Sequence, residues 1–223
     1  MDRTACLLLA MSLLALPCPP VTGEERYDQA VADLPPADLA NLLELVANYL
    51  SQDAPDLELE RRILAQESAS IKVLEAIIRW GPIHRPIEPG LHERTIVDPV
   101  GGRQSDLFIA IPTDYDPARR YPALIALHGT RGSSASARSL ATDLQRRFPD
   151  HLVATPHADP DLGWGPNEPG LSRVGGTLDL LLREFAVDPD RIGLTGFSQG
   201  GHGTWDYGTR HTDRFSALLP LAG

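Results

Sequence analysis

Short apolar runs alternate with helical patterns through the second part of the chain, and this alternation limits the folds open to it. Six runs have the length of strands, and they lie at residues 94–97, 107–111, 123–127, 152–155, 192–195 and 217–221. The later four are almost continuously apolar, as in strands buried on both faces of a parallel sheet. Helical patterns at residues 133–148, 172–186 and 200–211 supply the crossovers. The pattern predicts a three-layer α/β sandwich with a mostly parallel sheet.

The region before these runs, residues 24–90, has a different texture. Apolar residues recur there at helical spacing in two stretches. The first stretch follows a break at Pro35 with Asp38 as its N-cap, and the second ends at Gly81. Two helices are therefore expected, followed by a linker that ends at Gly90. The region holds no grouping suited to catalysis, so we interpret it as a helical cap or packing appendage, with partner binding as the alternative.

An apolar run at residues 7–16 lies close to the N-terminus, behind Arg3. The run is too short to span a bilayer. Small residues in Val21-Thr22-Gly23 suit a signal peptidase, so residues 1–23 are predicted to be an export signal cleaved after Gly23. The protein would then be secreted or periplasmic and would keep no membrane span. An uncleaved anchor and a buried first helix are the alternatives.

Charge and cysteine content exclude several classes of protein. The formal net charge is −10, which disfavours a nucleic-acid binder because phosphate backbones attract basic surfaces. Both cysteines, Cys6 and Cys18, fall within the expected signal, so the mature chain would have no disulfide and no cysteine metal ligand. A lipid anchor on Cys18 is disfavoured because Pro17 stands where a small flexible residue is needed. His151 and His157 have no partners at metal-ligand spacing, and no metal is expected.

A serine framed by glycines directly follows the fifth apolar run. The segment Gly196-Phe197-Ser198-Gln199-Gly200 stands between that run and a helical pattern. So tight a turn between strand and helix forces the serine into strained backbone angles, and its neighbours Gly196 and Gly200 must lack bulk. The hydroxyl is then lifted above the sheet, beside the free amides of the helix. We interpret Ser198 as a nucleophile, and a plain glycine-rich turn is the alternative.

A second signal, His128-Gly129-Thr130, follows the run at 123–127. Acyl transfer needs two amide donors for the oxyanion, one after the nucleophile and one in the loop after a neighbouring strand. Gln199 and Thr130 occupy these positions. His128 and Gly129 are expected to shape the loop, because a base that precedes the nucleophile in the chain does not suit this fold.

The loop after the run at 152–155 should emerge at the same end of the sheet as Ser198. Trp164 in this loop is a candidate for lining a substrate pocket, and packing at the rim is the alternative. Asp159 begins a faint calcium-loop pattern, but Gly170 stands where a bidentate glutamate is required. We therefore expect no metal in this loop.

Together these residues resemble the α/β-hydrolase superfamily, and within it the predicted esterases and peptidases related to dienelactone hydrolase and to the prolyl-oligopeptidase catalytic domain. The resemblance covers residues 91–223. Besides the serine elbow and His128-Gly129, it rests on Asp114-Tyr115-Asp116-Pro117, Tyr121-Pro122, Asp188-Pro189-Asp190-Arg191-Ile192, Gly203-Thr204-Trp205 and Asp213-Arg214-Phe215. It implies hydrolysis of a small-molecule or polymer-linked ester, or a similar acyl bond, through an acyl-serine and without a metal or organic cofactor. A prolyl-oligopeptidase-like peptidase is one alternative, and a non-catalytic relic that serves as a binding module is another.

The sequence departs from this family after the elbow. In members of this family the triad acid and base lie on loops after later strands, whereas this sequence stops at Gly223, just past the sixth run. The histidines and acids that follow Ser198 lie on the elbow helix or in the next turn, and we expect none of them to complete a triad. They are His202, Asp206, His211 and Asp213. The sequence is therefore interpreted as truncated, without its acid, base and last strands, and nearly inactive on its own.

Overall fold

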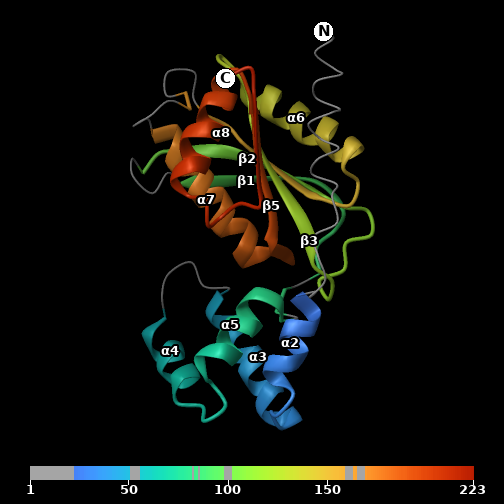
Figure 1. The fold of residues 1–223 in the computed structure, drawn as a ribbon, viewed down its shortest axis with the longest axis vertical. Helices are drawn as coiled ribbons and strands as arrows, with labels where there is room; N and C mark the ends of the chain where they lie inside the picture. The colour runs from blue at the N-terminus through green and yellow to red at the C-terminus, as the bar shows by residue number, and fades with distance from the viewer. Residues whose placement is uncertain are drawn as a thin grey trace.

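The computed structural model describes residues 23–50, 56–81, 83–84, 86–97, 102–158, 163–164 and 169–223. The predicted export signal, residues 1–23, lies outside the described residues except for Gly23. The described chain forms a helical unit at one end of a sheet that is covered by helices (Figure 1). In chain order the elements are α2 (Gly23–Val31), α3 (Pro36–Leu50), α4 (Leu57–Leu64), α5 (Ile71–Trp80), β1 (Gly90–Val97), β2 (Gln104–Ile111), β3 (Tyr121–Leu127), α6 (Ser134–Arg147), β4 (Leu152–Pro156), α7 (Pro169–Glu184), β5 (Val187–Phe197), α8 (Gln199–Arg210) and β6 (Ala217–Leu221).

The sheet has the strand order β1-β2-β4-β3-β5-β6. Strand β2 runs antiparallel to both of its neighbours, β1 and β4, whereas β4, β3, β5 and β6 run parallel to one another. The six predicted strands and the three crossover helices are all present, and the parallel strands are the four almost continuously apolar ones. The predicted α/β sandwich is thereby confirmed.

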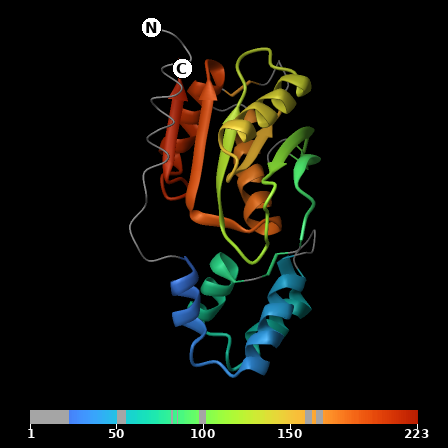
Figure 2. The same ribbon diagram turned by 90° about the vertical axis from the view of Figure 1, so that its right-hand side faces the viewer.

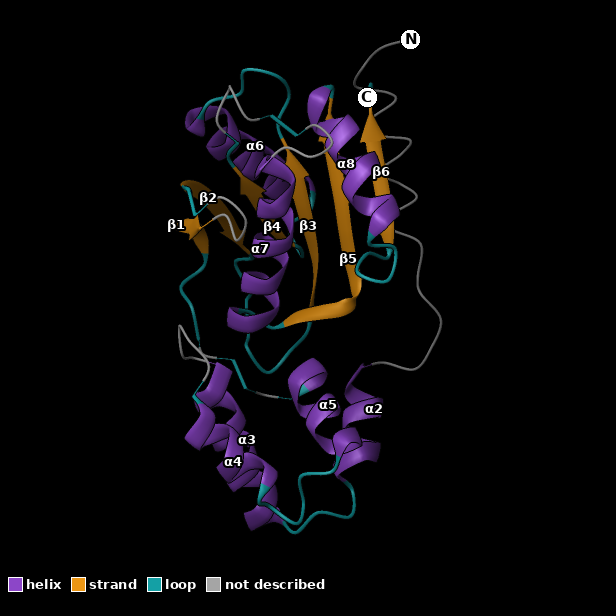
Figure 3. Cartoon of the chain, turned by 90° about the vertical axis from the view of Figure 1, so that its left-hand side faces the viewer, coloured by secondary structure: helices purple, strands orange, loops and turns teal. Residues whose placement is uncertain are grey.

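Helices cover both faces of the sheet, with α6 on one face and α7 and α8 on the other (Figure 3). Successive strand side chains alternate between the two faces. Leu124 of β3 therefore packs on the α6 side with Ala141, while Ile125 packs on the opposite side with Leu178. Because both faces are buried, each position of β3 is apolar, and burial of each large side chain stabilises the fold by about 1.5–3 kcal/mol. None of the helices in the described part of the chain combines the length and the apolar character needed to cross a membrane.

The helical unit, residues 23–81, contains more helices than the two predicted. Helix α3 matches the first prediction, although it begins at Pro36, so that Asp38 lies in its first turn and is not the N-cap. The second predicted helix is in fact two, α4 and α5, and Ser70 starts α5 by accepting a hydrogen bond from the Val73 amide. Helix α2, which is rich in charged residues, was not predicted. The unit has a core of its own, made of Leu42, Leu45, Val46, Leu59, Ile63, Val73 and Ile77.

The helical unit packs at the amino ends of the parallel strands (Figure 2). An exposed ion pair joins Arg26 of α2 to Asp190 at the start of β5, with 3.2 Å between nitrogen and oxygen. The Arg120 guanidinium, just before β3, donates to the Gly81 carbonyl at 2.6 Å. Ser198 follows the carboxyl end of β5, so the unit lies at the end of the sheet away from the serine.

Candidate active site

Ser198 sits in a strained turn between β5 and α8. Its backbone angles, φ 55° and ψ −119°, lie in a region that L-residues rarely adopt and that costs about 1–3 kcal/mol. The framing glycines make this turn possible. A Cβ on Gly196 would lie 2.3 Å from the Gly200 carbonyl oxygen, and one on Gly200 would lie 2.2 Å from the Leu127 carbonyl oxygen. The two glycines therefore let β3, β5 and α8 converge beneath the serine.

Backbone hydrogen bonds hold the strained serine from two sides. The Ser198 amide donates to the Leu221 carbonyl of β6 at 2.8 Å, and the Ser198 carbonyl accepts from the His202 amide at 3.0 Å. One turn further, the Thr204 hydroxyl donates to the Gly200 carbonyl at 2.8 Å. Since its own amide is already bonded to β6, Ser198 cannot serve as an oxyanion donor to a substrate.

The Gln199 amide has no acceptor within α8. It is the first amide of α8, and the opening amides of a helix have no acceptor within the helix. Ser198, as N-cap, makes no side-chain hydrogen bond to these amides. The positive end of the helix thus points at the serine, where negative charge would develop during acyl transfer.

The predicted second donor lies in a tight turn beside the nucleophile. Residues 129–132 form this turn, which is closed by a hydrogen bond of 3.1 Å from the Gly132 amide to the Gly129 carbonyl. Thr130 is exposed in the turn, and Arg131 takes a φ of 59°. A Cβ on Gly129 would lie 3.7 Å from the Ser198 Cβ. The structure thus brings the turn against the serine.

His128 is a buried, neutral residue that anchors this turn. Its Nε2 accepts a hydrogen bond of 3.0 Å from the Ala158 amide, so Nδ1 carries the proton and donates to the Gly129 carbonyl at 2.9 Å. Burial lowers the pKa of His128, the bond to Gly129 opposes this, and nearby His157 lowers the pKa further. Both ring nitrogens are engaged, so His128 shapes the loop and has no nitrogen free to act as a base.

Trp164 is fully buried and packs beneath the His128 loop. Its indole nitrogen donates to the His128 carbonyl at 2.9 Å, and its ring meets the His128 ring edge-on at 5.2 Å between centroids. A Cβ on Gly203 of α8 would lie 2.6 Å from the Trp164 Cβ. A ring that is 0% exposed offers no surface to a ligand, so the structure supports the packing alternative for Trp164 and not the pocket-lining prediction.

Sequence reasoning missed one residue of the site, Phe197. Its side chain is 48% exposed, directly before the nucleophile. One ring carbon, Cδ1, lies 3.6 Å from the position of a Cβ on Gly129, so the ring borders the turn that carries Thr130. Its place inside the glycine-framed segment was the available signal.

The histidines and acids that follow Ser198 are engaged elsewhere or directed to solvent. Asp206 pairs with Arg210, and the His211 ring stacks on Tyr207 at 4.3 Å between centroids, at the far end of α8. His202 and Asp213 are exposed. Within the described ranges, none of these side chains forms a hydrogen bond with the Ser198 hydroxyl, and no group of three residues suited to holding a metal is found.

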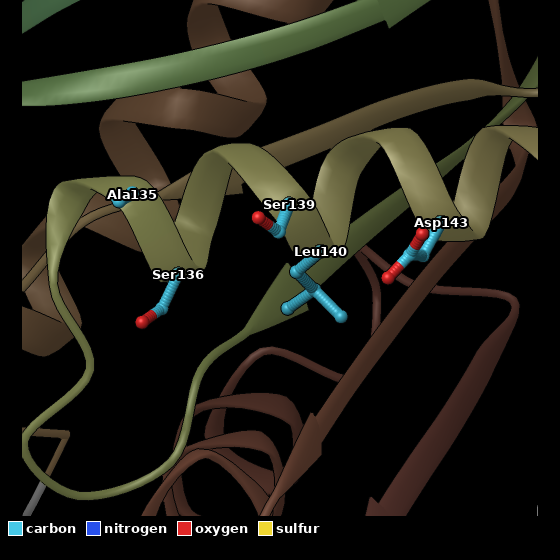
Figure 4. Close-up of a pocket in the computed structure, with 5 residues that line it drawn as sticks. All are labelled: Ala135, Ser136, Ser139, Leu140 and Asp143. Atoms are coloured by element: carbon cyan, nitrogen blue, oxygen red, sulfur yellow. The ribbon is translucent and has the colours of Figure 1, made fainter.

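A shallow hollow of about 490 Å³ lies on α6. It is lined by Ala135, Ser136, Ser139, Leu140 and Asp143, all from that one helix (Figure 4). None of the residues around Ser198 lines this hollow, so we place the site at the serine elbow.

Comparison with known proteins links this geometry to a group of enzymes. No family model matches the chain. A dipeptidyl-peptidase 5 from Porphyromonas gingivalis is 29% identical over 128 residues, which cover 52% of this chain and 19% of the relative. Among solved structures, a thermostable esterase matches with a TM-score of 0.52 and 27% identity, over 60% of this chain and 41% of the esterase.

A further solved structure, the S-formylglutathione hydrolase FrmB from Staphylococcus aureus, matches with a TM-score of 0.50 and 19% identity. The match covers 60% of this chain and 57% of the hydrolase, and it shows the fold alone. The chain thus spans less than two thirds of each of these proteins. The resemblance drawn from the serine elbow and the His128 turn is confirmed, and the chain is an α/β-hydrolase-fold protein, similar to esterases and to a dipeptidyl-peptidase.

Proposed function

We propose that the protein is an exported serine hydrolase that cleaves a carboxylic ester, or a related acyl bond, through an acyl-serine intermediate. One observation carries the proposal: the strained Ser198 lies between the first amides of α8 and an adjacent exposed turn. Similarity to the thermostable esterase supports it. The apolar run at residues 7–16, followed by a signal-peptidase pattern, supports export.

In the proposed reaction the Ser198 oxygen attacks the substrate carbonyl as its proton passes to a base. The carbonyl oxygen becomes an oxyanion, which accepts hydrogen bonds from the Gln199 and Thr130 amides. One such donor is worth about 3 kcal/mol of transition-state stabilisation. When the carbonyl re-forms, the bond to the alcohol breaks and the alcohol takes the proton from the base. Water then attacks the carbonyl of the acyl-serine and gives a proton to the base. The acid is released as the bond to Ser198 breaks and the Ser198 oxygen takes the proton from the base.

The base is proposed to be a histidine beyond Gly223, oriented by an acid that also lies there. This part of the proposal is supported by the described residues, because His128 uses both ring nitrogens and His211 stacks at the far end of α8. A triad with its acid and base on loops after the nucleophile is the arrangement that the resemblance implies.

A peptidase is the second candidate function, and one observation favours it. The relative from Porphyromonas gingivalis is a dipeptidyl-peptidase, and it shares 29% identity with this chain. Both candidates use the same serine and the same oxyanion donors. They differ in the leaving group, which is an alcohol in one case and an amine in the other.

Turnover of two chromogenic substrates tests the proposal. A p-nitrophenyl ester and a dipeptide p-nitroanilide are offered to a form of the protein that extends past Gly223, to Ser198→Ala and to Ser139→Ala. Ser139 is a matched control because it is an exposed serine on α6. We expect ester turnover in the parent and in Ser139→Ala only. Turnover of the anilide alone would assign the peptidase function, and activity that survives in Ser198→Ala would overturn the assignment of the nucleophile.

A further inference from the structure

We propose that His128 is a positioning residue that aims the Thr130 amide at the oxyanion by holding the carbonyl of the same peptide unit. The catalytic consequence rests on the proposed function. The geometric part, which concerns the tautomer of His128 and the direction of one peptide group, stands on its own.

The peptide bond between Gly129 and Thr130 sets the direction of the Thr130 N–H. Such a bond is planar and trans, so its C=O and its N–H point in opposite directions. The Gly129 oxygen accepts two hydrogen bonds, from His128 Nδ1 at 2.9 Å and from the Gly132 amide at 3.1 Å. These two bonds turn the carbonyl inward, and the Thr130 N–H is thereby turned outward on the exposed side of the turn.

The His128 ring can hold the carbonyl because its own orientation and tautomer are set by the neighbouring strand. The Ala158 amide, two residues past β4, donates to Nε2 and leaves the proton on Nδ1. The segment that carries Ala158 is itself anchored, because the preceding amide of His157 donates to the Asp106 carbonyl of β2 at 2.8 Å. A ring fixed by the sheet thus fixes the peptide of the turn.

Close packing around the ring leaves little room for another arrangement. His128 is 6% exposed, and Trp164 lies against it while donating to its carbonyl. A Cβ on Gly132 would lie 2.2 Å from His128 Nδ1, so a glycine is required where the turn closes over the ring. Without its proton, Nδ1 would be an acceptor that faces the Gly129 carbonyl oxygen, which is also an acceptor, and this repulsion would disfavour the turn.

Two substitutions separate positioning from packing. In His128→Asn the side-chain amide nitrogen lies near the position of Nδ1 and keeps a donor for the Gly129 carbonyl. In His128→Gln the side chain reaches toward the position of Nε2, which keeps an acceptor for Ala158 but removes the donor to Gly129. Both variants lose the aromatic ring, so a role in packing alone predicts similar defects.

The first measurement uses the 223-residue chain and requires no activity. Nitrogen NMR of His128 is expected to show the Nδ1–H tautomer. Hydrogen exchange of the Gly132 amide, which closes the turn, is expected to remain slow in His128→Asn and to become at least about tenfold faster in His128→Gln. An Nε2–H tautomer, or equal exchange in both variants, would overturn the proposal.

The second measurement is the rate at which a fluorophosphonate modifies Ser198 in the form that extends past Gly223. We expect His128→Asn to stay within about threefold of the parent, and His128→Gln to fall by about 10²-fold or more, the loss typical of a missing oxyanion donor. Thermal unfolding of both variants checks that they are folded. Equal rates in two folded variants would overturn the role of His128 in positioning the Thr130 amide. A parent that fails to react would instead overturn the proposed function, and the hydrogen bond from His128 to the Gly129 carbonyl would then be tested by the NMR and hydrogen-exchange measurements.

Discussion

The helical unit and the serine elbow lie at opposite ends of the sheet, and different interactions stabilise each of them. In the helical unit, Leu42 and its neighbours bury apolar side chains, and a polar cap such as Ser70 begins a helix. Around Ser198, by contrast, glycines let backbone atoms approach closely, and hydrogen bonds to carbonyls fix a strained serine. Substitutions in the unit should therefore lower stability and leave the serine unaffected, while substitutions at the elbow should affect both.

The largest effect is expected for Gly200→Ala. The added Cβ would meet the carbonyl oxygens of Leu127 at 2.2 Å and of His128 at 2.7 Å, both of which are backbone atoms. We expect a loss of about 3 kcal/mol or more in the free energy of unfolding. We also expect that Ser198 no longer reacts with a fluorophosphonate in the form that extends past Gly223. Gly176→Ala in α7 is the matched control, because its nearest neighbour lies 3.9 Å away. Urea denaturation should show the control unchanged or stabilised by up to about 1 kcal/mol.

Leu42→Ala, which would leave a cavity in the core of the helical unit, tests whether this unit affects stability alone. Leu42 is 0% exposed in the core of that unit, so Leu42→Ala is expected to cost about 2–5 kcal/mol of stability. At 25 °C, under conditions where the variant is folded, the rate of Ser198 modification should equal that of the parent. A slower rate in the folded variant would show that the two ends of the sheet are coupled.

These two regions also differ in how far the sequence predicted them. The elbow was predictable because its determinants, Gly196 and Gly200, are local and act on the serine between them. The break between α4 and α5 was not, because Leu64 and Ile71 are seven residues apart and continue the helical period across it. Both are in fact exposed, at 63% and 84%. The role of Trp164 was hidden for another reason, since its partner is a carbonyl 36 positions away in the chain.

Acid should destabilise the protein through two half-buried histidines, His84 and His151. Burial, and then the charge of Arg120, lower the pKa of His84 to about 3. Burial, and then Arg191, lower the pKa of His151 to about 4. The unfolded state binds protons first as the pH falls below about 6.5, so stability declines from there toward the folded-state pKa, by up to about 1.4 kcal/mol per pH unit for each histidine.

Urea unfolding between pH 7 and pH 4.5 measures this decline. His84→Gln removes the contribution of His84, which follows the helical unit, to the pH dependence of stability. His151→Gln removes the contribution of His151, which follows α6. Each variant should show a shallower fall than the parent. A parent whose stability is constant across this range would contradict the prediction that His84 and His151 are neutral in the folded protein.

The smallest effect is expected at the ion pair between the helical unit and the sheet. The side chains of Arg26 and Asp190 are 47% and 48% exposed, and exposed pairs contribute about 0–1 kcal/mol. Arg26→Ala should lower the free energy of unfolding by less than about 1 kcal/mol, as measured by urea denaturation. A larger loss would mean that this contact contributes more to the stability of the protein than an exposed ion pair ordinarily does.

The most direct test of the central claim, that Ser198 is an activated nucleophile, is to treat the protein with a fluorophosphonate and locate the adduct by mass spectrometry. The 223-residue chain and a form that extends past Gly223 are compared. We predict an adduct on Ser198 in the extended form and little or none in the 223-residue chain. An equal adduct in both would overturn the proposal of a base beyond Gly223, and an adduct on another residue, or none in the extended form, would contradict the claim itself.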